Sequence, residues 1–117
     1  MHYLLSAIAY MVGIYFVSAL SGQDAARLMP FRVPDYVLHG AEFAGLALLW
    51  YLVFTRTWNF EAGKARWLAL GIAAVYGLLD EYHQSFVPGR EPSVADWIAD
   101  VAGAAAAVMV AGRRMRR

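Results

Sequence analysis

The chain has 117 residues, enough for one domain, and 61% of them are hydrophobic, against about 45–50% in an ordinary soluble domain. It contains no cysteine, which excludes a disulfide framework, a thiol nucleophile and a thiolate metal site. The net charge of +1 gives no electrostatic basis for binding nucleic acid.

Four long apolar stretches follow one another along the chain. Each approaches the roughly 20 residues that a helix needs to cross about 30 Å of hydrocarbon. The first is not preceded by a positively charged segment and lacks a good cleavage signal, so we interpret it as a membrane helix and not as a signal peptide. We expect one integral membrane domain over residues 1–117, with transmembrane helices at about 3–20, 33–54, 66–87 and 93–111.

The connections between these stretches are short and rich in helix-breaking residues. Proline and glycine interrupt residues 21–32 and 88–92, while residues 55–65 contain Asn59 and Gly63. Short connections make consecutive helices antiparallel neighbours. The sequence therefore predicts an all-α fold, an up-down-up-down bundle of four helices.

The basic residues predict the orientation of this bundle. Four crossings place the N-terminus, the second connection and the C-terminus on one side of the membrane. That side holds seven of the ten basic residues: Arg56, Lys64, Arg66, Arg113, Arg114, Arg116 and Arg117. Because positively charged loops stay in the cytoplasm, we expect both termini to be cytoplasmic.

The acidic residues have the opposite distribution. Eight of the nine fall on the outer side or in the outer half of a helix: Asp24, Asp35, Glu42, Asp80, Glu81, Glu91, Asp96 and Asp100. Acidic residues contribute little to orientation, so membrane topology does not account for this bias. It suggests a site at the outer end.

The second helix opens with three polar residues on one face. Asp35, His39 and Glu42 are spaced i, i+4 and i+7, which brings them to the same side of a helix. At 1.5 Å per residue, Glu42 lies about 10 Å deeper than Asp35. This face therefore carries ionisable groups from the interface into the outer half of the bundle.

The third helix ends in a dense polar segment. Asp80, His83 and Gln84 are compatible with one face at i, i+3 and i+4, while Glu81 pairs better with Gln84 and Ser85. Arg90 follows in the turn. A guanidinium at this place could hold an anionic group through two parallel hydrogen bonds.

The fourth helix begins with Ser93, Asp96 and Asp100 at i, i+3 and i+7. Ser93 is a plausible helix N-cap, and Asp96 stands where a capping box has Glu or Gln. Asp100 lies a full turn deeper, so capping does not explain it.

Counted from the outer ends of the helices, Glu42, Asp80, Glu81 and Asp100 come to a similar depth. A charge there costs at least a few kcal/mol unless it is paired or hydrated. The partners could be Arg90, a histidine, a bound cation or shared protons. A hydrogen-bonded polar plug that locks the bundle is the structural alternative, but ionisable residues inside a membrane are usually functional.

Three segments together resemble the VanZ-like family. They are Asp35-Tyr-Val-Leu-His39-Gly-Ala-Glu42, Asp80-Glu-Tyr-His-Gln-Ser-Phe-Val-Pro-Gly-Arg90, and Ser93-x-x-Asp96-x-x-x-Asp100-x-x-Gly103-Ala104. Two positions depart from the usual pattern, which often has Lys at Tyr36 and Asn at Asp100. The resemblance implies a small bacterial membrane protein at the cell envelope, related to an accessory protein of teicoplanin resistance, and it implies no particular reaction.

Several kinds of function fit these residues. An enzyme could bind a divalent metal through Asp, Glu and His, with Arg90 on an anionic head group and His39 or His83 as acid or base. A binding protein would hold a lipid head group, a glycopeptide or a wall precursor without turnover. A proton- or ion-coupled transporter is less favoured, because the inner halves of the stretches are almost purely apolar.

Both of the favoured hypotheses use the same candidate residues and the same partners. The expected catalytic residues are Asp35, His39, Glu42, Asp80, Glu81, His83, Gln84, Asp96 and Asp100, and the expected ligand-binding residues are Arg90 and Ser93. The partners would be membrane lipid and a lipid-linked phosphate or a peptidoglycan precursor. A divalent metal is the one cofactor that the residue types suggest.

Overall fold

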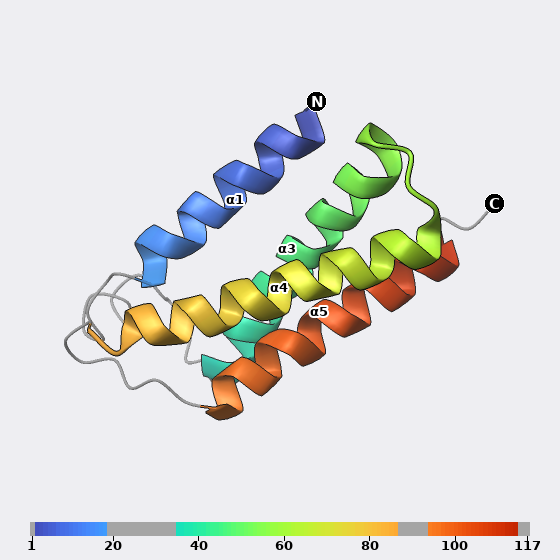
Figure 1. Cartoon of the computed structure of the whole chain (residues 1–117). Helices are drawn as coiled ribbons and strands as arrows, with labels where there is room; N and C mark the ends of the chain where they lie inside the picture. Colours follow the sequence, from blue (N-terminus) through green and yellow to red (C-terminus); the bar gives the residue numbers. More distant parts are fainter. Residues whose placement is uncertain (1, 19–34, 87–93, 115–117) are drawn as a thin grey trace.

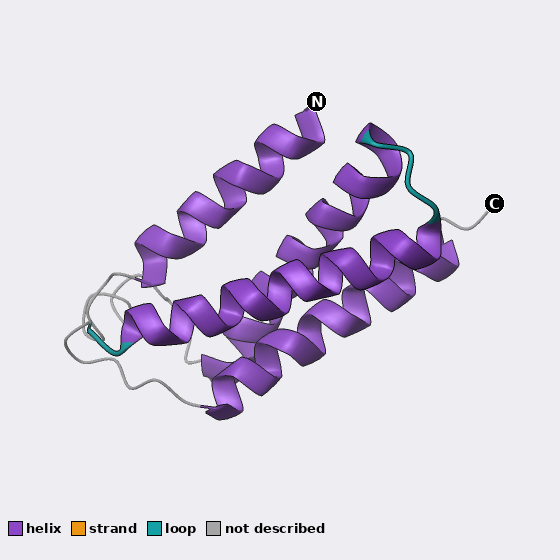
Figure 2. Ribbon diagram, in the orientation of Figure 1, coloured by secondary structure: helices purple, strands orange, loops and turns teal. Residues whose placement is uncertain are grey.

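A computed structural model describes residues 2–18, 35–86 and 94–114 of the chain. These residues form four α-helices and no strand: α1 His2–Ser18, α3 Asp35–Leu52, α4 Ala62–Gln84 and α5 Val94–Arg114. A short π-helix, η1 Val53–Thr57, continues α3 by one turn. Figure 2 shows that helix accounts for almost all of the described residues. The all-α, four-helix prediction is therefore confirmed.

Consecutive helices run in opposite directions, as Figure 1 shows. The C-terminal ends of α1 and α4 and the N-terminal ends of α3 and α5 lie toward one end of the bundle. We call this the carboxylate end, because Asp80, Glu81 and Asp100 belong to it. The start of α4 and the end of α5 lie at the other end, which we call the basic end after Lys64 and Arg66.

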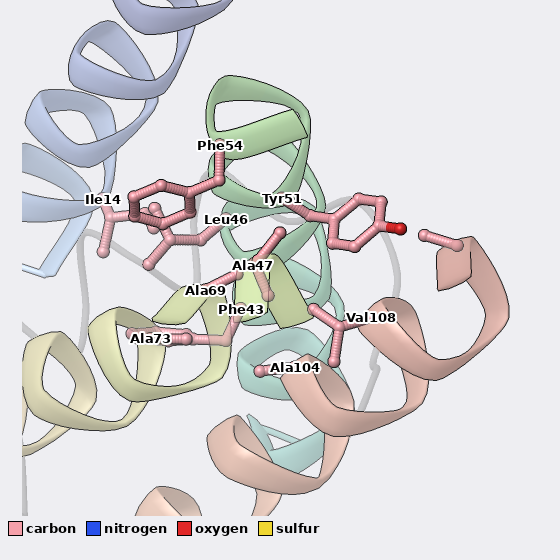
Figure 3. Close-up of a cluster of buried hydrophobic side chains, with 12 residues drawn as sticks. Ile14, Phe43, Leu46, Ala47, Tyr51, Phe54, Ala69, Ala73, Ala104 and Val108 are labelled. Atoms are coloured by element: carbon pink, nitrogen blue, oxygen red, sulfur yellow. The ribbon is translucent and has the colours of Figure 1, made fainter. Parts of the chain in front are cut away.

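The core forms around α3, which contacts each of the other three helices. Phe43, Leu46, Ala47 and Tyr51 of α3 are buried there, and Phe54 of η1 extends the same face. Figure 3 shows these side chains meeting small residues, Ala69 and Ala73 of α4 and Ala104 of α5, together with Val108 and Ile14. Large side chains on one helix thus pack against alanines on its neighbours, which lets the helices lie close together.

The closest approach of two helices is between α3 and α5. A Cβ atom at Gly103 would lie 2.8 Å from the Cα of Gly40 and 2.7 Å from its carbonyl carbon. Real Cβ atoms do not come so near to backbone atoms, so only glycine fits at Gly103 without a shift of the helices. At Gly103, α5 therefore packs directly against the backbone of α3.

Helix α1 is attached to the bundle by two tyrosines. The Tyr10 hydroxyl donates a hydrogen bond of 2.8 Å to the Glu42 carbonyl oxygen, and the Tyr76 hydroxyl donates one of 2.5 Å to the Met11 carbonyl oxygen. Gly45 leaves room for the first of these rings, since a Cβ there would lie 3.0 Å from the Tyr10 Cζ. These bonds satisfy polar groups that would otherwise be buried without a partner.

The turn between η1 and α4 is shorter than expected. The π-helix continues the helical backbone to Thr57, and the Glu61 carboxylate accepts a hydrogen bond of 3.0 Å from the Lys64 amide, which starts α4 at Ala62. Asn59 takes the positive φ of 57° that reverses the chain. The cap explains why α4 begins four residues before the expected Arg66.

Much of the outside of this bundle is apolar. Large hydrophobic side chains point outward from α1, α4 and α5, including Leu5, Phe16, Trp67, Val75, Leu78, Val94, Ile98 and Val110. Within residues 2–18, 35–86 and 94–114, no helix has both the length and the apolar character needed to cross a membrane. The expectation of membrane-spanning helices stays a prediction.

Candidate carboxylate site

Asp100 is the most deeply buried of the candidate residues. It lies two turns into α5 and is 0% exposed. Its neighbour on α4 is Gly77, where a Cβ would lie 3.0 Å from Asp100 Oδ2 and 3.3 Å from both Phe43 Cε2 and Trp97 Cδ1. The missing side chain of Gly77 therefore makes the space that Asp100 occupies.

Trp97 fixes α5 against α4 beside this carboxylate. Its indole Nε1–H donates a hydrogen bond of 2.9 Å to the Ala74 carbonyl oxygen, one turn before Gly77. Trp97 precedes Asp100 by three residues, so both side chains lie on the same side of α5. This bond defines the rotation of α5 that points Asp100 toward Gly77.

Asp80 and Glu81 place two more carboxyl groups in the interior, near the end of α4. They are 7% and 8% exposed, although successive residues of a helix point about 100° apart. Their joint burial means that neighbouring elements cover a wide face of α4 at this level. The Asp80 carboxylate and the Tyr15 hydroxyl are close enough to the Tyr76 hydroxyl to interact with it electrostatically.

His83 is half-buried, and its ring stacks on that of Tyr15 from α1. The ring centroids are 4.6 Å apart and the planes differ by 22°. The His83 Nδ1 atom is buried and has no hydrogen-bond partner among the described residues. The contact with the Tyr15 ring therefore helps to orient this imidazole.

Glu42 is half-buried on α3, next to Phe43. Its carbonyl oxygen accepts the hydrogen bond from Tyr10, and its carboxylate interacts electrostatically with the same hydroxyl. Phe43, which follows Glu42 on α3, contacts the Gly77 position on α4, and Asp80 lies one turn beyond Gly77. Together with Asp100 on α5, these residues show that three helices bring acidic residues to the carboxylate end.

The structure is informative for only part of the expected site. Asp35, His39, Gln84 and Asp96 lie on described helices, but their side chains fall outside what is described, and Arg90 and Ser93 lie outside the described residues altogether. Within the described part of the chain, no group of three or more His, Asp or Glu side chains has an arrangement that could hold a metal ion. The divalent metal stays a prediction.

Sequence reasoning overlooked Tyr15, Tyr76 and Gly77. The candidate residues expected from the sequence include none on α1, yet Tyr15 and Met11 of that helix contact His83 and Tyr76. One available signal was the glycine one turn before Asp80 in an otherwise apolar helix, because such a glycine often marks a close approach. Nothing in the sequence indicated that Tyr15 would contact His83.

These features define a class of protein: an all-α bundle of four helices with buried carboxyl groups near one end and apolar side chains over much of its outside. A protein-family model described as VanZ/LLP1 matches residues 3–114, and the chain belongs to this family. The match extends the resemblance, which began at Asp35, to include α1. Searches of curated proteins and of solved structures gave no match.

Proposed function

We propose that this protein is a multi-pass protein of the bacterial cytoplasmic membrane that acts at the outer face on an envelope lipid or a cell-wall precursor. The chemistry would be hydrolysis or transfer at a phosphate-bearing head group, with a link to teicoplanin resistance. The observation that carries the proposal is the complete burial of Asp100 against Gly77, beside the buried Asp80 and Glu81.

The membrane placement is supported by the side chains that the bundle turns outward. Trp67 and Val94 are each 73% exposed, and further large apolar residues are exposed on α1, α4 and α5. Monomeric soluble proteins rarely expose extensive apolar surface, whereas lipid solvates it. The excess of basic residues at the basic end supports a cytoplasmic position for that end.

A functional role for the carboxylate end is supported by the stability that the protein loses by burying carboxyl groups there. A buried carboxyl group loses hydration, and an apolar residue of similar size often gives equal or greater stability. The absence of a side chain at Gly77 leaves the space that Asp100 occupies. His83 would serve as acid or base, and Arg90, which follows α4 in the sequence, would hold the phosphate.

A second candidate is a binding protein without turnover, for a lipid head group, a glycopeptide or a wall precursor. The stack of Tyr15 on His83 favours it, because Tyr15 is 49% exposed and offers one ring for contact with a ligand. Flat rings beside carboxylates suit sugar or aromatic groups that carry polar substituents.

The two candidates are separated by measuring binding and turnover together. The full chain in liposomes would be given a polyprenyl diphosphate, with phosphate release and retention of labelled lipid followed in parallel. For an enzyme, Asp100→Asn and Glu81→Gln should reduce release about 100-fold or more while retention persists. Glu61→Gln at the basic end is the matched control, since it removes one exposed carboxylate.

The result also has outcomes that contradict the proposal. Retention without release in the unchanged protein would favour the binding role over the enzyme. If neither release nor retention responds to Asp100→Asn, while the melting temperature falls, the buried carboxylates act only as a structural plug. In a host that expresses each variant, susceptibility to teicoplanin should rank the variants in the same order as the lipid assay does.

A further inference from the structure

A second feature at the opposite end of the bundle is the packing of Arg66 over Gly112. A Cβ at Gly112 would lie 3.5 Å from both Cζ and Nε of Arg66 and 3.8 Å from Nη2. The guanidinium of α4 thus lies across the bare backbone of α5, where the start of one helix meets the end of the other (Figure 1). Any side chain larger than alanine at Gly112 would compete for this space.

The Arg66 side chain is only partly buried. Its Nε is buried and has no hydrogen-bond partner within the residues that the structure describes. The group keeps its charge at any physiological pH, and a buried donor without an acceptor costs stability. The buried Nε is out of reach of an external ligand, but the rest of this partly exposed side chain can still meet an external acceptor.

The charges nearby point to an anionic acceptor. Arg56, Lys64 and Arg113 are exposed at the same end, and the Lys64 ammonium lies 4.4 Å from the centre of the Phe60 ring. Among the described residues, Glu61 is the only acidic residue at this end, and its carboxylate accepts the Lys64 amide. The local charge is therefore positive and is not neutralised within the described part of the chain.

The surface beside Arg66 indicates the class of ligand. Trp67, the next residue, is 73% exposed, and Trp58 in the adjoining turn is also exposed. Tryptophan next to arginine is typical of the level where lipid head groups meet acyl chains. A phosphodiester offers two oxygens in the geometry that a guanidinium fork binds.

We propose that Arg66, placed over Gly112, binds the phosphate of an anionic phospholipid in the cytoplasmic leaflet. This site is separate from the carboxylate end and rests on the membrane placement proposed above. The membrane placement and the lipid site can be disproved separately. Extraction with alkaline carbonate tests whether the chain is embedded in a membrane, while the lipid measurement below tests Arg66 alone.

The experiment uses the full chain in a mild detergent, titrated with short-chain phosphatidylglycerol, with phosphatidylcholine of the same chain length or with inorganic phosphate. The shift of the melting temperature gives an apparent affinity for each. Phosphatidylglycerol should raise the melting temperature most. Arg66→Gln should weaken its apparent affinity about tenfold or more, because a charge-assisted, two-point contact is lost.

Three further variants test the placement of the charge. Gly112→Val keeps every charge but fills the space under the guanidinium, so it should weaken phosphatidylglycerol binding nearly as much as Arg66→Gln. Arg113→Gln makes the same change of net charge at an exposed position and should have little effect. Arg66→Lys, which keeps the charge and most of the stem, should bind at an intermediate level and replaces Arg66→Gln if that variant does not fold.

Two results would overturn the assignment. If Arg66→Gln and Arg113→Gln weaken binding equally and Gly112→Val has no effect, the attraction is a diffuse property of the basic end and not a site. If inorganic phosphate produces the same Arg66-dependent shift as phosphatidylglycerol, the ligand is a free phosphate and not a lipid. Asp100→Asn should leave the lipid response unchanged, because it changes only the carboxylate end.

Discussion

The two ends of the bundle treat charge in opposite ways. At the carboxylate end, Asp80, Glu81 and Asp100 point inward and are almost completely buried. At the basic end, Lys64 and Arg113 are exposed, and the rings of Phe54 and Phe60 stack 5.5 Å apart beside them. Both ends look polar in the sequence, but the carboxylate end buries three whole carboxyl side chains, whereas Arg66 at the basic end is only partly buried.

This difference indicates which end was shaped for chemistry. Charges at the surface of a helix end are cheap and suit topology and lipid contact. Charges inside a bundle are expensive and are retained where they perform a task. The glycines differ in the same way, since Gly77 and Gly103 make room for tight contacts at the carboxylate end, while Gly112 leaves an ordinary van der Waals gap.

The largest effect on stability is expected at Gly103. Gly103→Val would drive a side chain into the backbone of Gly40 and should destabilise the fold by about 3 kcal/mol, because neither helix backbone can yield locally. The measurement is thermal unfolding in detergent. Gly71→Ala is the control, since a Cβ there meets nothing within 4 Å and should change stability by at most about 1 kcal/mol, in the favourable direction. Equal losses in both variants would contradict the close contact of α3 and α5.

The next effect is expected at Gly77, and it should be functional more than structural. Gly77→Ala places a Cβ 3.0 Å from Asp100 Oδ2, so the carboxylate must shift by a few tenths of an ångström. We expect a loss of activity or ligand retention of about tenfold, with a loss of stability of about 1 kcal/mol. Lipid-phosphate release and thermal unfolding, measured on the same samples, distinguish the two contributions. Unchanged activity would mean that the position of Asp100 does not matter for function.

The helical stretches and the acidic bias could be predicted because they depend on local properties. Apolar runs bounded by proline and glycine predict helices, and residues such as Asp80 and Asp100 can be assigned to a level by counting turns. The contacts between helices could not be predicted in this way. Whether Asp100 meets Gly77, or Tyr15 meets His83, depends on the rotation of each helix about its axis, and helical periodicity alone does not determine that rotation.

The start of α4 is a second feature that the sequence alone did not predict correctly. Hydropathy placed its start at Arg66, because the preceding connection, with Asn59 and Gly63, interrupts the apolar stretch. The actual start depends on one hydrogen bond, from the Lys64 amide to the Glu61 carboxylate, and glutamate is not among the preferred capping residues. A weak local signal thus decided the boundary, and it was not visible in composition.

A smaller effect is expected where α1 joins the carboxylate end. Tyr15→Leu removes the ring that stacks on His83 and should cost about 1 kcal/mol of stability, whereas Tyr15→Phe keeps the stack and should cost less. If the stack also orients His83 for acid–base chemistry, Tyr15→Leu should lower turnover and Tyr15→Phe should preserve it. Tyr82→Leu is the matched control, because that ring is exposed and contacts Phe86 instead. Equal effects of Tyr15→Leu and Tyr82→Leu would place α1 outside the site.

The smallest effect is expected at the basic end, from the cap of α4. Glu61→Ala removes the acceptor of the Lys64 amide and should destabilise the fold by about 0.5 kcal/mol, since that amide can bond to water instead. Activity at the carboxylate end should not change, because α4 is 23 residues long and the cap lies at its opposite end. Thermal unfolding and lipid-phosphate release test both statements. A large loss of activity with this variant would mean that the two ends are coupled through α4, and the contrast between an enclosed end and an exposed one would no longer separate function from anchoring.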